Sequence, residues 1–213
     1  MAGESLQSAE LTIGGIPGDR GRYVVGARDE ILSARTKPGL LRHHATVDDH
    51  GAVLVDGLPW DSTQIATAVQ ASAGQGARIV EADGPERFDI LPLLVATDGA
   101  IDAFGYDRRC LRPNIVLAGV PGLAERSWEG RQLAIGDVVV ELADLRGRCI
   151  MTTWDPDTGT QDVGVLRHIR ASFDGTLALN AWAGRPGQVA IGDLARLLDE
   201  RAAVEYPEGG RYT

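Results

Sequence analysis

Cys149 lies in a segment whose composition could activate a thiol. Arg146 and Arg148 precede it, and an apolar, β-branched run follows at 150–153. Neighbouring positive charge favours the thiolate, which is the form that attacks electrophiles and binds metals. Cys149 is therefore a candidate nucleophile or metal ligand. A buried structural cysteine is the alternative interpretation, because free cysteines are among the most buried residue types.

Two motifs contain most of the residues that could do chemistry. The first is RRCLRPNIVL at 108–117, and the second is RCIMTTWDPDTG at 148–159. In the second motif we expect a strand over 150–153, with Cys149 at its start. Asp155, Pro156, Asp157 and Gly159 are typical turn residues and are expected to hold the cysteine rather than to contact a substrate.

Other kinds of site are poorly supported. His43 and His44 are neighbours on an expected strand, so their side chains should point to opposite faces and cannot share a metal. His50 and His168 are isolated in the sequence, and the two cysteines lie far apart. No serine occupies a nucleophile elbow, so a Ser-His-Asp triad is not indicated.

Composition sets further limits on function. The chain has 213 residues, of which 44% are hydrophobic and 24% charged, which is ordinary for a soluble globular protein. Its net charge of −9 argues against nonspecific nucleic-acid binding and gives no support for membrane association. The apolar runs are too short to span a bilayer, and the first ten residues show no signal peptide. With two cysteines and no disulfide framework, we expect a cytoplasmic protein.

The periodicity predicts a mainly β (α+β) fold. Short strands at this spacing, separated by glycine, proline and aspartate turns, are typical of a barrel. Helices are expected at 62–71 and 163–172, and a shorter one should start at Thr97 or Asp98 and end before Gly105. The expected strands are 22–25, 30–33, 40–47, 52–55, 77–81, 91–95, 114–118, 138–142, 150–153, 177–183 and 193–198.

The order and spacing of several motifs resemble the MOSC family, a β-barrel domain related to the C-terminal part of molybdenum cofactor sulfurases. These motifs are RPNIVL, AERSWEG, the IGD at 135–137, the RC-x-x-TT-x-DPDTG segment and the closing PGQVAIGD. GIPGDRGRYVV at 15–25 and LSARTKPGLL at 32–41 look like the N-terminal region of mitochondrial amidoxime-reducing components. The resemblance implies an N-terminal MOSC-associated β-rich region at 1–84, a MOSC β-barrel at 85–205 and a loose tail at 206–213.

The resemblance also implies a cofactor and its ligands. In relatives that hold the molybdenum cofactor, the cysteine at the position of Cys149 supplies the protein sulfur to the metal, and a soft thiolate suits such a metal. Guanidinium groups suit the phosphate of the pterin. The implied cofactor-binding residues are Arg20, Arg35, Thr97, Asp98, Arg112, Asn114 and Arg148. Cys110 has no counterpart in the functional set and is interpreted as structural.

The implied activity is reduction of N-hydroxylated or other N- or S-oxygenated small molecules, with a separate protein as electron donor. The alternative is a noncatalytic carrier, in which Cys149 holds a persulfide or the chain shields the cofactor. A cofactor-free structural barrel is the third interpretation. A complete sulfurase is not expected, because pyridoxal phosphate needs a Schiff-base lysine and Lys37 has no supporting motif. Relatives place a Lys–Ser pair before the segment matching 2–11, so we expect either an upstream start or weak cofactor binding.

Overall fold

The computed structural model describes residues 1–48, 50–82 and 89–206. Their packing forms two compact units. The first unit contains Met1–Ser5, Gly18–Glu86 and Trp154–Asp162, and the second contains Leu6–Pro17, Arg87–Thr153 and Val163–Thr213. The predicted boundary at 84 and 85 falls outside the described residues, as does the predicted tail beyond Tyr206. Among the described residues, no helix is long and apolar enough to cross a membrane.

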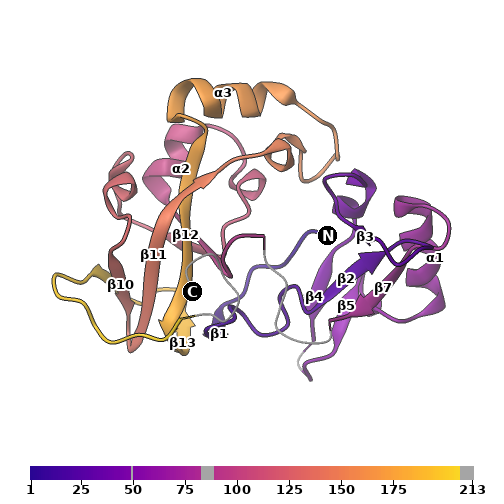
Figure 1. The fold of residues 1–213 in the computed structure, drawn as a ribbon, viewed down its shortest axis with the longest axis horizontal. Coiled ribbons are helices and arrows are strands. Elements are labelled where there is room, and N and C mark those ends of the chain that lie inside the picture. The colour runs from indigo at the N-terminus through magenta and orange to yellow at the C-terminus, as the bar shows by residue number, and fades with distance from the viewer. Residues whose placement is uncertain (49, 83–88, 207–213) are drawn as a thin grey trace. The chain divides into compact units, whose positions relative to one another are not determined.

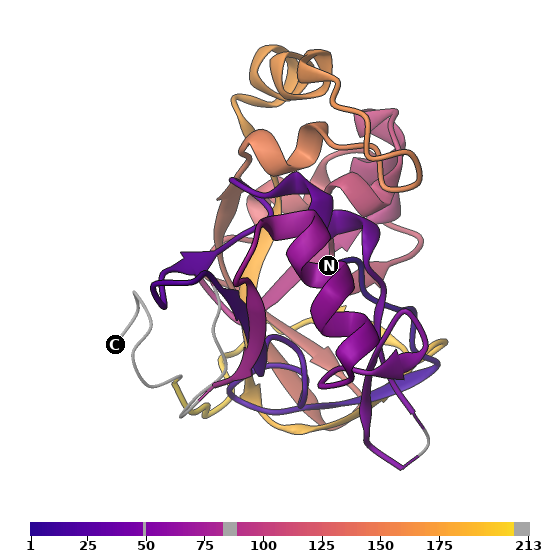
Figure 2. The same ribbon diagram turned by 90° about the vertical axis from the view of Figure 1, so that its right-hand side faces the viewer.

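The first unit combines two small antiparallel sheets with one helix. One sheet has the order β3 (Ile31–Leu32), β2 (Arg22–Val25), β7 (Arg78–Glu81), and the other has the order β4 (Ala45–Val47), β5 (Val53–Val55), β6 (Leu58–Pro59). Helix α1 (Thr63–Ala73) begins where the Ser62 hydroxyl accepts a hydrogen bond from the N–H of Ile65. Figure 2 shows α1 in front of the strands of its unit. Ile65 and Val69 bury the inner face of α1 in the core of this unit.

The strand predicted at 40–47 is wrong in its first half. Pro38–Arg42 forms a 3-10 helix, η1, and the strand β4 starts only at Ala45. Pro38 stands in the first turn of η1, where its fixed φ favours a helical conformation.

The change from helix to strand leaves His43 buried between them. Its Nδ1 lies 2.6 Å from Asp56 Oδ2, and its Nε2 lies 2.8 Å from the hydroxyl of Ser72, in the last turn of α1. Burial tends to raise the pKa of Asp56, but the hydrogen bonds from His43 and from the His44 N–H outweigh it, and the pKa is lowered. The backbone N–H groups around Ser72 are committed to the helix and cannot form an oxyanion hole. We therefore assign this trio a structural role, in which it ties η1 and the β5–β6 turn to α1.

The second unit is built on a six-stranded sheet curled into a half-barrel (Figure 1). Its strand order is β14 (Ala195–Leu197), β10 (Gln132–Ile135), β11 (Val138–Gly147), β12 (Thr176–Arg185), β8 (Leu93–Thr97), β9 (Ile115–Leu117). Only the β8–β9 pair in this sheet is parallel. A separate ribbon pairs β1 (Ser8–Leu11) with β13 (Gly187–Ala190). The prediction of a mainly β fold with a few short helices is confirmed.

Helices gather at the end of the sheet where β11 ends and β12 begins (Figure 1). They are α2 (Asp98–Phe104), α3 (Val163–Phe173) and the 3-10 turns η2 (Arg108–Cys110), η3 (Ala124–Ser127) and η4 (Ile150–Thr153). The three predicted α-helices are confirmed to within a few residues. Turn η4 packs against both α3 and η2. This end of the second unit therefore brings both sequence motifs together.

The strand predicted at 150–153 is wrong. This segment forms η4, in which the Thr152 hydroxyl donates to Cys149 O at 2.9 Å and the Thr153 hydroxyl donates to Ile150 O at 2.7 Å. Threonine favours strands in general, but its hydroxyl can also bond a carbonyl one turn earlier. Both threonines are buried, and here their local hydrogen bonds stabilise the helical turn.

Candidate functional site around Cys149

Cys149 is positioned by the junction between β11 and η4. The N–H of Arg148 donates to Gly175 O at 2.8 Å, which fixes the backbone just before the cysteine. The carbonyl of Cys149 accepts from both the N–H and the hydroxyl of Thr152, at 3.1 and 2.9 Å. Its thiol is free and partly exposed. Cys149 is thus held by a rigid turn, and its sulfur remains accessible to a ligand.

Arg148 places a partly buried cation beside this thiol. One terminal nitrogen donates to Leu111 O at 2.6 Å, whereas the buried Nε has no hydrogen-bond partner. Desolvation lowers the Arg148 pKa to about 10, helped by the positive charges of Arg146 and Arg112 and opposed by Cys149. Arg148 therefore stays charged at neutral pH. No carboxylate neutralises it within the part of the chain that the structure describes, so an anion would satisfy it.

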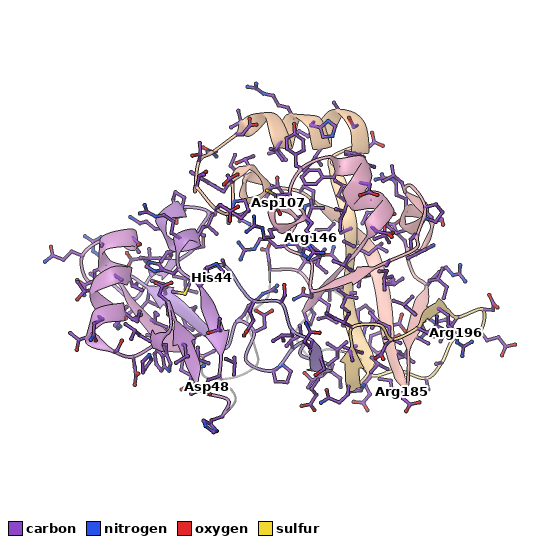
Figure 3. All side chains as sticks on the ribbon, turned by 180° about the vertical axis from the view of Figure 1, so that it is seen from behind. His44, Asp48, Asp107, Arg146, Arg185 and Arg196 are labelled. Atoms are coloured by element: carbon purple, nitrogen blue, oxygen red, sulfur yellow. The ribbon has the colours of Figure 1, made fainter. Side chains whose placement is uncertain are left out.

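Arg146 differs from Arg148, although only Gly147 separates them in the sequence. It donates to Asp89 Oδ2 at 2.8 Å and to Asn180 Oδ1 at 3.1 Å. The amide of Asn180 in turn donates to Asp144 Oδ1 at 2.8 Å. Figure 3 labels Arg146 in the second unit. Arg146 is therefore paired with groups of the protein and stabilises the sheet. Arg148 has no carboxylate partner among the described residues and can bind a ligand.

A cavity of about 410 Å³ opens beside Cys149. Arg148, Cys149 and Ile150 form one wall. The other wall is a single face of α3, which presents Val163, Leu166, Arg167 and Arg170. The cavity thus combines apolar surface, a thiol and three guanidinium groups. The sequence analysis did not single out Arg167 and Arg170, although their spacing of three residues places them on the same side of a helix.

Arg112 has a strained backbone. Its φ is +57°, in the left-handed region that non-glycine residues rarely adopt. It lies two residues after the end of η2, and its N–H donates to Arg109 O at 3.2 Å. Arg20, in the first unit, likewise has a φ of +60°. Asp29, Asp56, Asp174 and Ala178 also have a positive φ, so this conformation does not by itself assign a function to the two arginines.

Asn114 joins β9 to β8. Its N–H donates to Leu94 O at 2.9 Å, and its side-chain Oδ1 accepts from the N–H of Leu94, also at 2.9 Å. This pair of hydrogen bonds aligns the start of β9 with β8. The carbonyl side of the Asn114 amide is thus already used within the protein, and its predicted contact with a cofactor would have to come from the amide NH₂.

Thr97 and Asp98 organise the start of α2. The Thr97 hydroxyl accepts from Ala100 N at 3.1 Å and donates to Glu125 Oε2 at 3.2 Å, and the residue is fully buried. The carboxylate of Asp98 accepts from Gly119 N at 2.6 Å and from Val120 N at 3.0 Å. Hydrogen bonds from these two backbone N–H groups lower the Asp98 pKa. Both side chains shape the loop after β9, and their contact with a cofactor remains a prediction.

Glu125 is a buried carboxyl group beneath Thr97. It is 0% exposed, its Oε1 has no hydrogen-bond partner, and desolvation raises its pKa despite the bond from Thr97. A carboxyl whose folded pKa is raised loses stabilising free energy as pH rises through that pKa. We therefore compare the free energy of unfolding of Glu125→Gln with that of wild type at two pH values. The difference in favour of the variant should be about 1 kcal/mol larger at pH 7.5 than at pH 4.5. Urea unfolding at both pH values measures this, and an equal difference at both would contradict it.

Arg20 and Arg35 belong to the first unit and are both exposed. Arg20 Nε lies 3.4 Å from Asp19 Oδ2. Their predicted contact with the cofactor stays a prediction. Of the predicted set, the second unit contains Thr97, Asp98, Arg112, Asn114, Arg148 and Cys149. Arg112 lies close enough to Arg148 for its positive charge to lower the Arg148 pKa.

Comparison with known proteins finds a family model that matches the region around the site. The model of the MOSC domain matches residues 101–196. Mitochondrial amidoxime-reducing component 1 of Mus musculus is 38% identical over 80 residues, which cover 35% of this chain and 23% of that protein. Component 1 of Homo sapiens is 52% identical over 48 residues, which cover 22% of this chain and 14% of that protein. The chain thus matches less than a quarter of the length of these curated relatives.

Two solved structures show a more distant likeness. The YuaD protein of Bacillus subtilis has a TM-score of 0.45 and 15% identity, covering 91% of this chain and 86% of that chain. YiiM of Escherichia coli has a TM-score of 0.38 and 14% identity, covering 59% of this chain and 67% of that chain.

Proposed function

Because this chain carries a MOSC domain at residues 101–196, we propose that it binds the molybdenum cofactor, with Cys149 as the protein's ligand to the metal. We further propose that the loaded protein reduces N-hydroxylated or other N- or S-oxygenated small molecules. The observation that carries the proposal is the pairing of a partly exposed thiol with a partly buried guanidinium that has no carboxylate partner and an unpartnered Nε, in the motif RC-x-x-TT-x-DPDTG.

The residues of the second unit fit this cofactor. Cys149 offers a soft sulfur donor, which suits molybdenum better than oxygen donors would. Arg148 has an unpartnered buried Nε, and Arg112 is exposed beside it, so both can meet an anionic phosphate. In the first unit, Arg20 and Arg35 are proposed to complete the set of guanidinium groups.

The proposed reaction removes one oxygen from the substrate. When bound, the molybdenum cofactor would supply two electrons to the N–O bond, so that RN–OH, two electrons and two protons give RN–H and water. Cys149, which lines the cavity and whose backbone is fixed by η4, would hold the metal. Arg148 keeps a positive charge next to Cys149. Ile150 and Val163 provide apolar surface for the organic part of the substrate.

A separate protein is proposed to deliver the electrons. The relatives named above are components of amidoxime-reducing systems, which supports a partner of this kind. The small molecule and the electron donor would then be the two partners of the loaded chain.

Expression in a host that makes the molybdenum cofactor tests the proposed function. We expect molybdenum near one atom per chain and reduction of benzamidoxime with a reduced viologen dye as electron donor. The matched control is the same protein from a strain that cannot make the cofactor, which should be inactive. If protein purified from the competent host contains no molybdenum, the proposal is overturned.

A sulfur-carrier role is the second candidate, favoured by the partial exposure of the Cys149 thiol. After incubation with a cysteine desulfurase and cysteine, mass spectrometry would detect a persulfide on Cys149. A persulfide without any reductase activity would support the carrier, and activity without a persulfide would support the reductase.

A further inference from the structure

The cavity beside Cys149 has a cationic rim that the proposed function does not use. Val163, Leu166, Arg167 and Arg170 follow the spacing i, i+3, i+4 and i+7, so one face of α3 forms this wall. The adjoining face of α3 buries Val165, Ile169 and Phe173 in the core. The two arginines are therefore held on a rigid helix and are not part of a loose loop.

The charge in this cavity is uncompensated. Within the described part of the chain, neither Arg167 nor Arg170 has a carboxylate within 4.0 Å. Arg148, on the facing wall, is already assigned to the cofactor phosphate, so the site proposed here consists of the two arginines of α3. Arg167 and Arg170 are both exposed, and their like charges lie on the same side of α3, so this wall of the cavity attracts an anion.

The cavity also has an apolar part. Ile150, Val163 and Leu166 line it, and Val163 is 42% exposed. A free inorganic anion would leave this surface in contact with water. A small molecule with an apolar body and one carboxylate or phosphate group would cover the apolar wall and pair with the arginines.

We propose that this cavity binds the anionic group of the substrate, so that the protein acts on N-oxygenated small molecules that carry a carboxylate or phosphate. This inference rests on the proposed function for the reaction, but the anion site itself depends only on residues 148–170 of this chain. Arg167 and Arg170 are then specificity-determining residues, which select the substrate without taking part in the removal of oxygen.

Alkylation of Cys149 tests the anion site without any cofactor. In full-length, cofactor-free protein, the Cys149 thiolate displaces iodide from iodoacetate or from iodoacetamide, forming a C–S bond as the C–I bond breaks. The arginines should attract the anionic reagent and have no effect on the neutral one. We expect the ratio of the iodoacetate rate to the iodoacetamide rate to fall about tenfold in Arg167→Gln/Arg170→Gln at low salt. In wild type, salt at about 0.5 M should remove most of this preference.

The matched control removes two other exposed arginines of the same unit. Asp107 directly precedes η2, which packs against η4, so it marks the end of the unit that holds Cys149. Figure 3 shows Arg185 and Arg196 at the opposite end of this unit from Asp107. Arg185→Gln/Arg196→Gln changes the net charge equally and should leave the ratio within about twofold of wild type. Mass spectrometry of the peptides separates Cys149 from the buried Cys110. Equal ratios in wild type and in Arg167→Gln/Arg170→Gln would overturn the anion site.

A substrate pair connects the anion site to the reaction. In the loaded protein, we expect Arg167→Gln/Arg170→Gln to raise KM for 4-carboxybenzamidoxime about tenfold and to leave KM for benzamidoxime unchanged. The two proposals fail separately. An alkylation preference in the cofactor-free protein, combined with no molybdenum in protein from the cofactor-making host, would support the anion site and overturn the proposed function. Reduction of both substrates with identical KM changes would overturn substrate selection and leave the proposed function standing.

Discussion

Replacing Cys149 with serine is expected to abolish turnover while leaving the fold intact. A hydroxyl stays protonated at neutral pH and is a poor ligand for a soft metal, so the rate per bound molybdenum should fall more than about 100-fold. The thiol is partly exposed, so the free energy of unfolding should change by less than about 0.5 kcal/mol. Molybdenum content, steady-state rate and urea unfolding measure the three quantities. The arginines can retain part of the pterin, so some metal should remain.

Cys110→Ser is the matched control for Cys149→Ser. Cys110 is 8% exposed and packs in the core with Phe104 and Leu111. A hydroxyl placed there should cost about 1–2 kcal/mol of stability and leave the rate per bound molybdenum unchanged. If both serine variants lose the same rate per metal, Cys149 has no special role in the chemistry.

Replacing Arg112 with glycine is expected to lower cofactor occupancy without a matching loss of stability. The substitution removes a guanidinium whose charge-assisted contact with a phosphate contributes about 1.5–3 kcal/mol, which corresponds to a loss of affinity of roughly 10- to 100-fold. Glycine also relieves the left-handed backbone at φ +57°, which costs other residues about 1 kcal/mol. The variant should therefore unfold within about 1 kcal/mol of wild type, and its remaining loaded molecules should turn over normally.

Asp174→Gly separates the two effects of the Arg112 substitution. Asp174 also has a positive φ, of +54°, and its side chain is 96% exposed. Glycine should relieve the same kind of strain there and leave molybdenum content unchanged. An Arg112→Gly protein with wild-type molybdenum content would remove Arg112 from the cofactor site.

The sequence predicted the elements whose pattern is local. The α3 helix was predictable because Val163, Leu166, Ile169 and Phe173 recur at helical spacing, and the helix is found at Val163–Phe173. Thr97 was predictable as a helix start, since threonine is a preferred cap and the residues that follow can form a helix. The strand β10 was not predicted, because its four buried residues, Gln132–Ile135, show no alternation of polar and apolar side chains.

The parts of the site that depend on packing between distant segments could not be predicted. The η4 turn contradicts strand propensity because the Thr152 and Thr153 hydroxyls bond to nearby carbonyls. The partner of Arg148, Leu111 O, lies 37 residues away in the sequence. The cationic wall of the cavity depends on which face of α3 turns toward Cys149, and the sequence pattern identifies only the buried face.

X-ray absorption at the molybdenum edge tests the central claim most directly, because it counts the sulfur atoms bound to the metal. Wild type and Cys149→Ser should be compared at equal molybdenum concentration, with Cys110→Ser as the control. We expect the metal in Cys149→Ser to have one sulfur ligand fewer than in wild type, and the metal in Cys110→Ser to match wild type. An unchanged sulfur count in Cys149→Ser would show that Cys149 does not bind the metal.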